Sequence, residues 1–387
     1  ETEILNMLLE RGKKNGVPSL EIWDAEKLRE QEPNLNKDAL CALYAPTAAV
    51  VSPWEYALAL AETAVLNGVR LFLNHEATAI ARAEGCYHIQ IRNGGGLECK
   101  TVVNAAGLYS DAVHNMTAEP SFKILPDKGE YYLMDKSEGE TVSHVIFQCP
   151  TPTGKGTLIS PTVHGNLIVG PNNEPPADKD DVSTSAAGLG QVSRAARKTV
   201  PDLNLRSAIR TFGGIRAASD SEDFIIAEAK GAPGFIDLAG IKSPGLTAAP
   251  AIAKMAAALL KKSGLELTEK ENHIRTRKKI HFAGLNIAEK QKLISARPEY
   301  GRVICRCETV TEGEILDAIR SPVPPVSVEG VKRRCNAGMG RCQGGFCGPR
   351  VVELLSAELG VSPLAVPQDK AGSFILVSET KKGGCHG

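Results

Sequence analysis

The sequence has no excess of either charge, no long apolar run and no leader-like start. Lysine and arginine together number 45, as do aspartate and glutamate, so the formal net charge is zero. A chain without net charge is not typical of proteins that bind nucleic acid or anionic membranes through an overall field. No run approaches the roughly 18 apolar residues of a membrane span, and the start lacks the basic and apolar regions of a signal peptide. These absences favour a cytoplasmic protein that would meet a membrane only peripherally, through a partner.

An initiator methionine is also missing. The chain begins Glu1-Thr2-Glu3-Ile4-Leu5, which reads like the middle of a domain, so we expect a further segment upstream. The 387 residues are enough for two domains or more. An apolar content of 42% and a charged content of 23% are ordinary for a globular protein.

Cysteine is plentiful but unevenly placed. The sequence has ten cysteines, some isolated along the first part of the chain and one, Cys385, in the tail. A secreted disulfide framework would be short and rich in cysteine throughout. Local clustering in a long chain instead favours metal ligation. The clustered residues are Cys305, Cys307, Cys335, Cys342 and Cys347.

Changes in the expected secondary structure divide the chain into segments. Alternating helices and strands, as in an α/β fold, are interrupted by strand-like pieces with proline, glycine and asparagine turns, which are typical of an antiparallel sheet. The expected segments are an α/β domain over 1–115, an antiparallel domain over 116–230 with one helix near 182–198, the returning α/β part over 231–264, a charged linker over 265–300, a compact cysteine domain over 301–362 and a tail over 363–387. Within the linker, the basic stretch Arg275 to Lys279 is expected to be solvated.

Several boundaries within the α/β part can be predicted. Ser52-Pro53-Trp54-Glu55 forms a capping box with proline at the first helical position, and apolar residues from Trp54 to Leu66 follow at helical spacing. Asn67-Gly68 ends this helix. Strands are expected over 69–73, over 77–91 as a pair, over 101–107 and over 235–239.

Two glycine-containing segments that follow strands are the first indications of a ligand-binding site. The strand that runs into Asn104-Ala105-Ala106-Gly107 ends in small residues, which let the backbone approach a flat or charged ligand; the same pattern suits tight helix packing. Leu238 to Thr247 is a glycine loop that opens a helix and would aim free N–H groups and the positive end of the helix dipole at a ligand. The alternative for this loop is an ordinary strand–helix turn.

Taken together and in this order, these segments resemble the D-amino-acid oxidase superfamily of FAD enzymes, in the branch of anaerobic-type glycerol-3-phosphate dehydrogenases and L-2-hydroxyglutarate dehydrogenases. The resemblance covers residues 1–262 and implies a Rossmann-like α/β FAD-binding fold with an antiparallel-sheet substrate domain. It is carried by Glu32-Pro33, Pro53, Asn104 to Gly107, Lys128 to Tyr132, Val169-Gly170-Pro171-Asn172, Gly214-Ile215-Arg216 and Gly240 to Thr247.

The sequence departs from this family in one respect. The family opens with a βαβ unit bearing G-x-G-x-x-G, which cradles the FAD pyrophosphate at a helix N-terminus, and this sequence has no match to it. Gly94-Gly95-Gly96 is instead expected as a hairpin tip. The resemblance therefore begins partway through the family's chain, and we expect this fragment alone to retain little FAD and to be inactive.

The resemblance also assigns site residues. Arg216 would offer a bidentate fork to a substrate carboxylate or phosphate, the alternative being an ion pair with Asp220 or Glu222. Lys242 would support the anionic reduced flavin or the substrate, and either Tyr131 or Tyr132, of which we take Tyr132, would face the site. No single catalytic base stands out. The cofactor residues implied are Ala77 beside the adenine, Asn104, Ala106 and Gly107 along the ADP portion, Gly240, Ile241, Gly245, Leu246 and Thr247 along the isoalloxazine and ribityl chain, and Gly214.

The cysteine segment carries a separate signal. Cys305-Arg306-Cys307 and Cys342 to Cys347 give C-x-C and C-x₄-C spacings, separated by a helix with a capping box at Thr311 to Glu314. Four thiolates from two short loops can surround a 2Fe–2S cluster, each loop serving one iron, whereas structural zinc usually takes C-x₂-C knuckles. The segment resembles the bacterioferritin-associated-ferredoxin-like domain, which is helical and small. The resemblance implies Cys305, Cys307, Cys342 and Cys347 as ligands, with Cys335 as a bystander.

These features together favour an FAD-dependent dehydrogenase that oxidises a small anionic 2-hydroxy compound, with sn-glycerol 3-phosphate favoured. Electrons would pass through the cluster to an accepting protein or subunit. An L-2-hydroxyglutarate or amino-acid dehydrogenase on the same fold is the alternative enzyme. A non-enzymatic iron–sulfur electron-transfer module on a vestigial flavin fold is the alternative of a different class.

Overall fold

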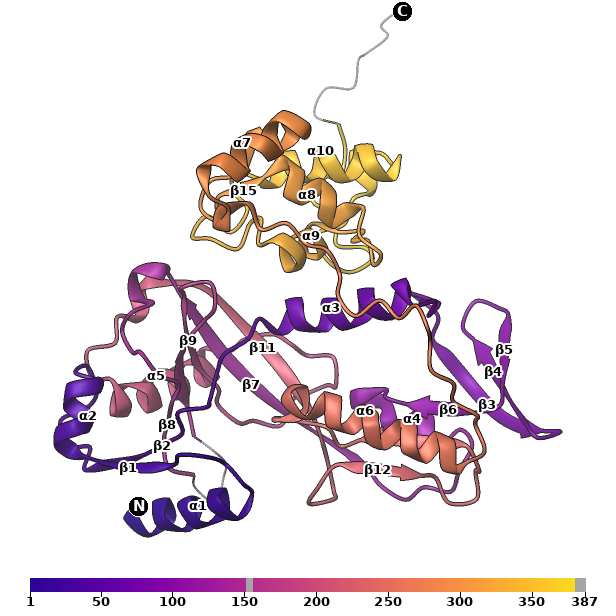
Figure 1. Cartoon of the computed structure of the whole chain (residues 1–387), viewed down its shortest axis with the longest axis horizontal. Helices are drawn as coiled ribbons and strands as arrows, with labels where there is room; N and C mark the ends of the chain where they lie inside the picture. Colours follow the sequence, from indigo (N-terminus) through magenta and orange to yellow (C-terminus); the bar gives the residue numbers. More distant parts are fainter. Residues whose placement is uncertain (151–155, 380–387) are drawn as a thin grey trace, which may run out of the picture. The chain divides into compact units, whose positions relative to one another are not determined.

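A five-stranded antiparallel sheet is the largest feature of the computed structural model, which describes residues 1–150 and 156–379. Helix α5 (Ala186–Thr199) covers one face, and its N-cap Ser185 accepts a hydrogen bond from the backbone N–H of Gly188. Met134, Ile159, Leu167, Val192 and Ala196 are fully buried between helix and sheet. In the order in which they pair, the strands are β11 (Ala208–Ser219), β7 (Ile124–Met134), β10 (Leu167–Gly170), β9 (Leu158–Pro161) and β8 (Ile146–Phe147) (Figure 1).

A smaller sheet contains the parallel pair that the sequence predicts. Strand β6 (Val102–Asn104) runs parallel to β13 (Phe235–Ala239), and β12 (Ile225–Glu228) pairs antiparallel on the other side of β13. The strand expected over 101–107 is present but short; β6 is the edge of this sheet, and Val103 is 41% exposed. The helical elements that follow the two parallel strands are η1 (Gly107–Tyr109) and α4 (Ser110–His114) after β6, and α6 (Gly245–Lys262) after β13.

The remaining strands form two local sheets. The pair expected over 77–91 is confirmed, broken at Glu84-Gly85. Gly94 and Gly95 lie in the connection to the next strand, which Gly96 opens, so the expected hairpin tip is also confirmed. The strand expected over 69–73 is wrong: these residues form a coil and turn, because no neighbouring strand pairs with them in the described structure. The elements not yet given in this region are α1 (Thr2–Lys14), β1 (Glu21–Asp24), α2 (Ala25–Gln31), β2 (Cys41–Tyr44), β3 (Ala77–Ala83), β4 (Cys86–Ile91), β5 (Gly96–Cys99), η2 (Lys136–Glu138) and η3 (Leu205–Ser207).

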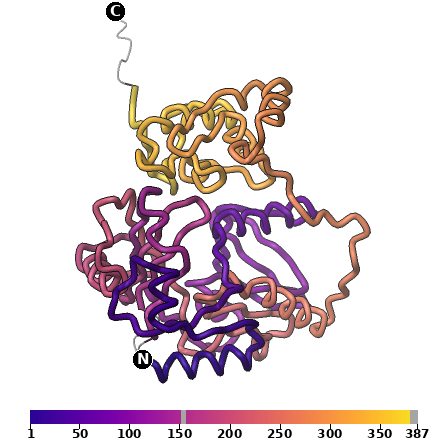
Figure 2. Tube along the Cα trace, turned by 60° about the vertical axis from the view of Figure 1, so that its left-hand side comes forward, coloured from indigo at the N-terminus to yellow at the C-terminus, as the bar shows by residue number. Residues whose placement is uncertain are grey.

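The chain divides into two units, and it enters the second unit twice. The first unit comprises Glu1–Val50 and Phe72–Glu271, and the second comprises Val51–Leu71 and Asn272–Gly387. The chain therefore reaches the second unit at α3 (Pro53–Leu66), leaves it for the first unit, and returns (Figure 2). The segment limits predicted from the sequence remain predictions.

The second unit is helical apart from one short strand pair. Its core contains Ile315, Val331, Val351 and Leu355, all at most 1% exposed. The capping box expected at Thr311 is present and opens α8. Besides α3, the elements are η4 (Phe282–Gly284), α7 (Ile287–Ala296), η5 (Pro298–Gly301), β14 (Val303–Cys305), β15 (Val310–Thr311), α8 (Glu312–Ile319), α9 (Val328–Cys335), α10 (Gly348–Leu359) and η6 (Pro363–Ala365).

Helix α3 begins as predicted but does not bury the expected face. Ser52 caps it by accepting from the N–H of Glu55, with Pro53 in the first turn. Trp54 is nevertheless 42% exposed, and the buried residue of α3 is Glu62, whose carboxylate pairs with Arg277. Lys279 pairs with Glu55 at 2.6 Å. The expectation of a solvated stretch is therefore wrong for Arg277, whose side chain is 14% exposed because its carboxylate partner lies in a helix far away in the sequence. Lys279 is paired but stays exposed.

Among the described residues, no helix is both long and apolar enough to cross a membrane.

Candidate functional site

The loop between β13 and α6 adopts a conformation that requires glycine. Gly240 has φ +65°, and a Cβ there would come 2.6 Å from the Oγ of Ser219. At the start of α6, a Cβ on Gly245 would lie 2.4 Å from the Cγ2 of Ile241. Within residues 1–150 and 156–379, no side chain caps this helix N-terminus. The first N–H groups of α6, those of Leu246 and Thr247 among them, therefore lack intrahelical acceptors and can bind a partly negative ligand atom.

The end of β6 lies beside the same loop, because β6 and β13 are parallel neighbours and their carboxyl ends share one edge. The side chain of Asn104 is buried and donates to the carbonyl of Ser110 and to Oδ1 of Asp237, both at 2.8 Å. Both amide hydrogens are thus used within the protein, and Oδ1 accepts from the N–H of Ala106 at 3.3 Å, so the side chain of Asn104 shapes the strand end. Ala106 is half-buried, while Gly107, with φ +57°, faces open space.

A buried polar network that sequence reasoning missed holds these two strand ends together. Asp237 accepts from Asn104 through one oxygen and contacts Nδ1 of His114 at 2.7 Å through the other. Nε2 of His114 lies 3.0 Å from the carbonyl of Glu119 and 3.1 Å from the hydroxyl of Ser121. The only signal in the sequence is an aspartate inside the apolar strand Phe235–Ala239. Ala77, the predicted adenine contact, begins β3 in a separate sheet.

Arg216 lies on the antiparallel sheet and is already paired. Its Nη1 contacts Oδ2 of Asp127 at 2.8 Å, and Nη2 lies 3.5 Å from the carbonyl of Asn172. The guanidinium packs over Gly129, where a Cβ would come 2.5 Å from Nη2. The ion pair that the sequence left open therefore exists, but with Asp127 rather than with Asp220 or Glu222. Gly214 lies two residues before Arg216 on the same strand, opposite Gly129.

Strand alternation separates the two tyrosines. Tyr131 stacks on Phe212, with ring centroids 5.1 Å apart, whereas the Tyr132 hydroxyl donates to the carbonyl of Leu189 in α5. In the register of β7 and β11, Tyr131 is opposite Phe212 and Asp127 is opposite Arg216. Since residues two apart share a face, Tyr131 lies on the face of Arg216 and Tyr132 on the face covered by α5. Tyr132 and Arg216 therefore cannot face one ligand across this sheet.

Lys242 is a cation without an ion-pair partner among the described residues. It lies in the glycine loop, its side chain is exposed, and it makes no ion pair within the described part of the chain. Its backbone N–H donates to the carbonyl of Gly240 at 3.1 Å, which fixes the turn. The ammonium is thus free to bind an anion beside the N-terminus of α6.

The four predicted cluster cysteines come together as two sulfur pairs in the second unit. Sγ of Cys307 lies 3.5 Å from Sγ of Cys342, and the thiol of Cys347 donates to the sulfur of Cys305. This hydrogen bond lowers the pKa of Cys305 to about 6 and raises that of Cys347. Each pair takes one cysteine from each loop, whereas the sequence suggested that each loop serves one iron.

Two pairs suit a two-iron cluster better than a single ion. In a 2Fe–2S cluster each iron takes two protein thiolates, while structural zinc takes four ligands around one centre. Among the described residues, no three Cys, His, Asp or Glu side chains surround one ion position. The N–H of Gly338 points to the sulfur of Cys305 at 3.4 Å, a bond of the kind that tunes cluster potential. These residues fit a 2Fe–2S cluster.

The second cysteine loop is fixed by its own side chains. Gln343 has φ +47°, and its amide donates to the carbonyls of Met339 and Gly340. Its Oε1 accepts from the buried ammonium of Lys332 at 3.0 Å. Cys335 stays apart: its thiol donates to the carbonyl of Val331, and burial raises its pKa to about 12. A protonated thiol is a poor metal ligand. Cys385 lies outside the described residues.

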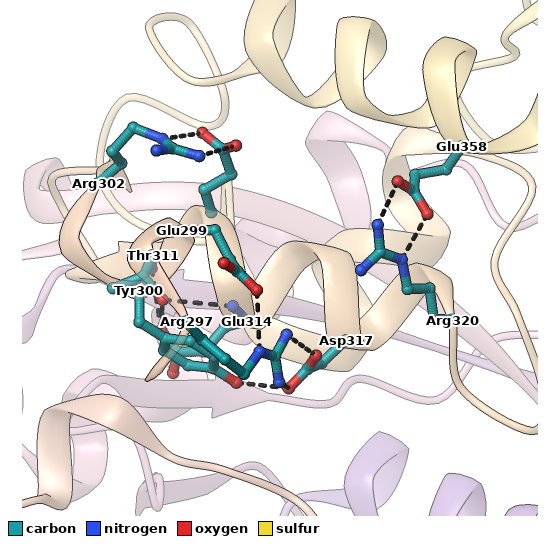
Figure 3. A network of polar contacts seen from close by, with 10 residues as sticks. Arg297, Glu299, Tyr300, Arg302, Thr311, Glu314, Asp317, Arg320 and Glu358 are labelled. Atoms are coloured by element: carbon teal, nitrogen blue, oxygen red, sulfur yellow. Dashed lines mark hydrogen bonds and ion pairs between the residues drawn. The ribbon is translucent and has the colours of Figure 1, made fainter. Parts of the chain in front are cut away.

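A polar network braces the helices beside the cysteine loops (Figure 3). Tyr300 is fully buried, its hydroxyl donates to Asp317, and both burial and this bond raise its pKa. Arg297 lies over the Tyr300 ring at 4.8 Å and also pairs with Asp317 at 2.6 Å. Arg320 and Glu358 form a two-pronged pair between α8 and α10 (Figure 3). The frame that carries the cysteines is therefore held by ion pairs as well as by its apolar core.

Comparison with known proteins assigns both parts. Residues 1–259 match the family model described as FAD dependent oxidoreductase. The chain belongs to this family. Residues 303–357 match the BFD-like [2Fe-2S] binding domain. The chain is 46% identical to a glycerol 3-phosphate dehydrogenase of Caloramator mitchellensis, over 98% of this chain and 79% of that protein. It is 34% identical to a glycerol 3-phosphate oxidase of Mycoplasma genitalium, over 69% of this chain and 71% of that protein.

Solved structures agree with the fold of this FAD-dependent oxidoreductase. An L-α-glycerophosphate oxidase from Mycoplasma pneumoniae with FAD bound is 30% identical, with a TM-score of 0.63 over 70% of this chain and 72% of that chain. A glycerol-3-phosphate dehydrogenase from Bacillus halodurans, 15% identical, has the same fold with a TM-score of 0.63 over 88% of this chain and 76% of that chain. The predicted fold class is confirmed.

FAD and a 2Fe–2S cluster are the cofactors of this oxidoreductase. FAD supplies the hydride acceptor when bound, and the cluster supplies a one-electron carrier. The N–H groups at the start of α6 fit the part of a flavin that becomes negative on reduction. Cys305, Cys307, Cys342 and Cys347 fit the cluster. The individual FAD contacts stay predictions.

Proposed function

We propose that this oxidoreductase oxidises sn-glycerol 3-phosphate at FAD and passes the electrons singly through the 2Fe–2S cluster to a protein acceptor. The observation that supports this most is the extent of one likeness: the 46% identity to a glycerol 3-phosphate dehydrogenase runs over 98% of this chain. That likeness includes the cluster domain as well as the flavin part. A relative that shared only the flavin part would not account for the cysteine pairs.

The cations of the first unit suit a small anionic substrate. Lys242 is exposed in the loop before α6 and makes no ion pair within residues 1–150 and 156–379, so it can bind a phosphate or carboxylate without breaking another contact. Arg216 would reach a substrate only by sharing or exchanging Asp127. Oxidation of the alcohol also requires a group that takes the hydroxyl proton within hydrogen-bond reach. Tyr131, on the face of Arg216, is a candidate for that position.

An L-2-hydroxyglutarate dehydrogenase is the second candidate. Such an enzyme from Escherichia coli O17:K52:H18 is 31% identical, over 44% of this chain and 41% of that protein. The same cations would hold its two carboxylates. The shorter match makes this candidate weaker than glycerol 3-phosphate.

A substrate panel tests the proposal. The full-length protein, loaded with both cofactors, is given sn-glycerol 3-phosphate, L-2-hydroxyglutarate or amino acids under anaerobic conditions, and flavin bleaching and dye reduction are followed. We expect glycerol 3-phosphate to give the highest kcat/KM, and Lys242→Ala to lower it while the matched Lys230→Ala does not. Preference for another substrate would reject glycerol 3-phosphate. Failure of every substrate to reduce the flavin would favour a non-enzymatic electron carrier.

A further inference from the structure

The two sulfur pairs of the second unit differ in their access to solvent. Cys305 is 1% and Cys347 is 2% exposed, so one pair lies in the core. Cys307 is exposed and Cys342 is half-buried, so the other pair lies at the surface. Because electron transfer weakens steeply with distance, a carrier outside the protein would exchange electrons fastest at the outer pair.

An exposed phenylalanine lies beside the outer pair in the sequence. Phe346 lies between Cys342 and Cys347 and is 87% exposed, although the neighbouring helix α10 buries Val351 and Leu355. The loop that carries it is fixed: the N–H of Gly345 donates to the carbonyl of Cys342 at 2.9 Å, and that of Gly348 donates to the carbonyl of Gly344 at 2.7 Å. The ring is therefore held outward by an ordered backbone. Aromatic side chains presented in this way are enriched among the residues that dominate protein–protein binding.

An arginine precedes each cysteine of the outer pair. Arg306 comes directly before Cys307, and Arg341 directly before Cys342; both arginines are exposed. Arg341 already interacts within the protein, and two other exposed arginines of this unit pair with carboxylates: Arg302 with Glu312 at 2.7 Å and Arg320 with Glu358 at 2.6 Å. Arg306 makes no ion pair with any residue that the structure describes. It therefore offers a guanidinium that can bind a partner's carboxylate without losing an existing contact.

We propose that Arg306, Cys307, Arg341, Cys342 and Phe346, here called the cluster rim, are the docking surface for an acidic one-electron carrier protein. Phe346 would insert into an apolar depression of the carrier, and Arg306 would contact a carboxylate beside it. This inference rests on the proposed electron relay and names its exit. Each encounter would move one electron: a cluster held by the four cysteines would lose it and the carrier would gain it. The two electrons from one alcohol oxidation therefore reduce two carriers.

The test compares carriers of opposite charge on the full-length holoprotein. The cluster is reduced with dithionite, excess reductant is removed, and reoxidation is followed anaerobically by stopped flow with oxidised flavodoxin as the acidic carrier or cytochrome c as the basic carrier. We expect the second-order rate constant with flavodoxin to fall as salt rises, because the encounter is steered by charge. The rate with cytochrome c should not fall in this way.

Two rim variants and two matched controls give the decisive result. Arg306→Glu and Phe346→Ala should each lower the flavodoxin rate at least about tenfold, about 1.4 kcal/mol of binding or activation free energy. Lys292→Glu, a charge reversal on an exposed part of α7, and Phe374→Ala, a truncation of a 50% exposed phenylalanine, should leave it unchanged. The electron paramagnetic resonance spectrum of the reduced cluster should be the same in all four variants, and ferricyanide should reoxidise them at similar rates.

Three outcomes would overturn the rim assignment. The first is a flavodoxin rate that the rim variants do not change. The second is an equal loss in the control variants. The third is slower reduction of the cluster by substrate, with unchanged reoxidation by flavodoxin, since the rim would then receive electrons from the flavin. A protein whose flavin no substrate reduces, or which shows no 2Fe–2S spectrum, would instead contradict the proposed function.

Discussion

The two units differ in how far apart in the sequence their functional residues lie. The cluster cysteines come from two short loops of the second unit, and each sulfur pair joins one loop to the other. Most of the predicted FAD contacts of the first unit lie at the ends of β6 and β13, which meet only because these distant strands pair in parallel. Local spacing is visible in a sequence, whereas strand pairing across a whole domain is not. We therefore expect substitutions in the cysteine loops to abolish the cluster outright. Substitutions in the first unit should change activity or stability by degrees.

The largest effect is expected from the cysteines. Replacing Cys305, Cys307, Cys342 or Cys347 singly by serine should abolish the 2Fe–2S chromophore, because each iron requires two thiolates. Cys335→Ser should leave the visible spectrum intact, since its thiol is protonated and bonded to Val331. The measurement is absorption and electron paramagnetic resonance after anaerobic reconstitution. A colourless protein with one zinc per chain would show that the domain is structural.

Arg216→Lys should lower kcat/KM of the full-length enzyme by roughly tenfold to a thousandfold and raise KM, because a lysine cannot form a bidentate pair with a phosphate or carboxylate. Asp127→Asn is the matched variant, since Asp127 holds the same guanidinium at 2.8 Å. It should change KM less. If both variants lose stability equally and neither changes KM, the pair is structural and Arg216 does not bind substrate.

Asp237→Asn should lower the free energy of unfolding by about 2 kcal/mol, because an amide nitrogen would replace one carboxylate oxygen, so that either His114 or Asn104 would face a donor in place of its acceptor. Urea unfolding followed by circular dichroism measures this. Asp202→Asn is the control, because Asp202 is exposed. A difference between the two variants below about 0.5 kcal/mol would mean that the network does not hold the strand ends.

The smallest effect concerns Asp181, whose pKa is lowered to about 2 by hydrogen bonds from Ser183 and Lys128. A carboxyl group with a lowered folded pKa stabilises the fold above its unfolded pKa, and this contribution is lost as pH falls through the folded value. The unfolding free-energy difference between wild type and Asp181→Asn should therefore be constant from pH 7 to about 5 and shrink towards about pH 2. A difference that grows on acidification would contradict this assignment.

Helix ends and strands that depend on residues close together in the sequence could be predicted. The N-cap at Ser52, the capping box at Thr311, the strand pair over 77–91 and strand 235–239 follow from local residue patterns, and the structure confirms them. The alternation of helices and strands also predicted the combination of a parallel and an antiparallel sheet.

The rest could not be read from local patterns. Residues 69–73 have strand-like composition but no partner strand in the described structure. The stripe of α3 looked like a core face, yet the helix buries Glu62 because Arg277, distant in the sequence, comes to meet it. Which tyrosine shares a sheet face with Arg216 depends on the register between β7 and β11. Which cysteine sulfurs pair depends on how their two loops approach each other. In each case the deciding neighbour lies far along the chain.

Because α3 belongs to the second unit while the residues before and after it belong to the first, more than one chain segment joins the two units. The backbone crosses between them after Val50, after Leu71 and after Glu271. A single protease cut between residues 265 and 272 would leave the second unit attached, because α3 would still hold it. Glu62 of α3 pairs with Arg277, and the side chain of Asn67 makes two hydrogen bonds with the backbone of Ile274. Release would require a further cut near one of the other crossings together with loss of those contacts. Domain dissection by proteolysis should thus yield nicked but unseparated protein.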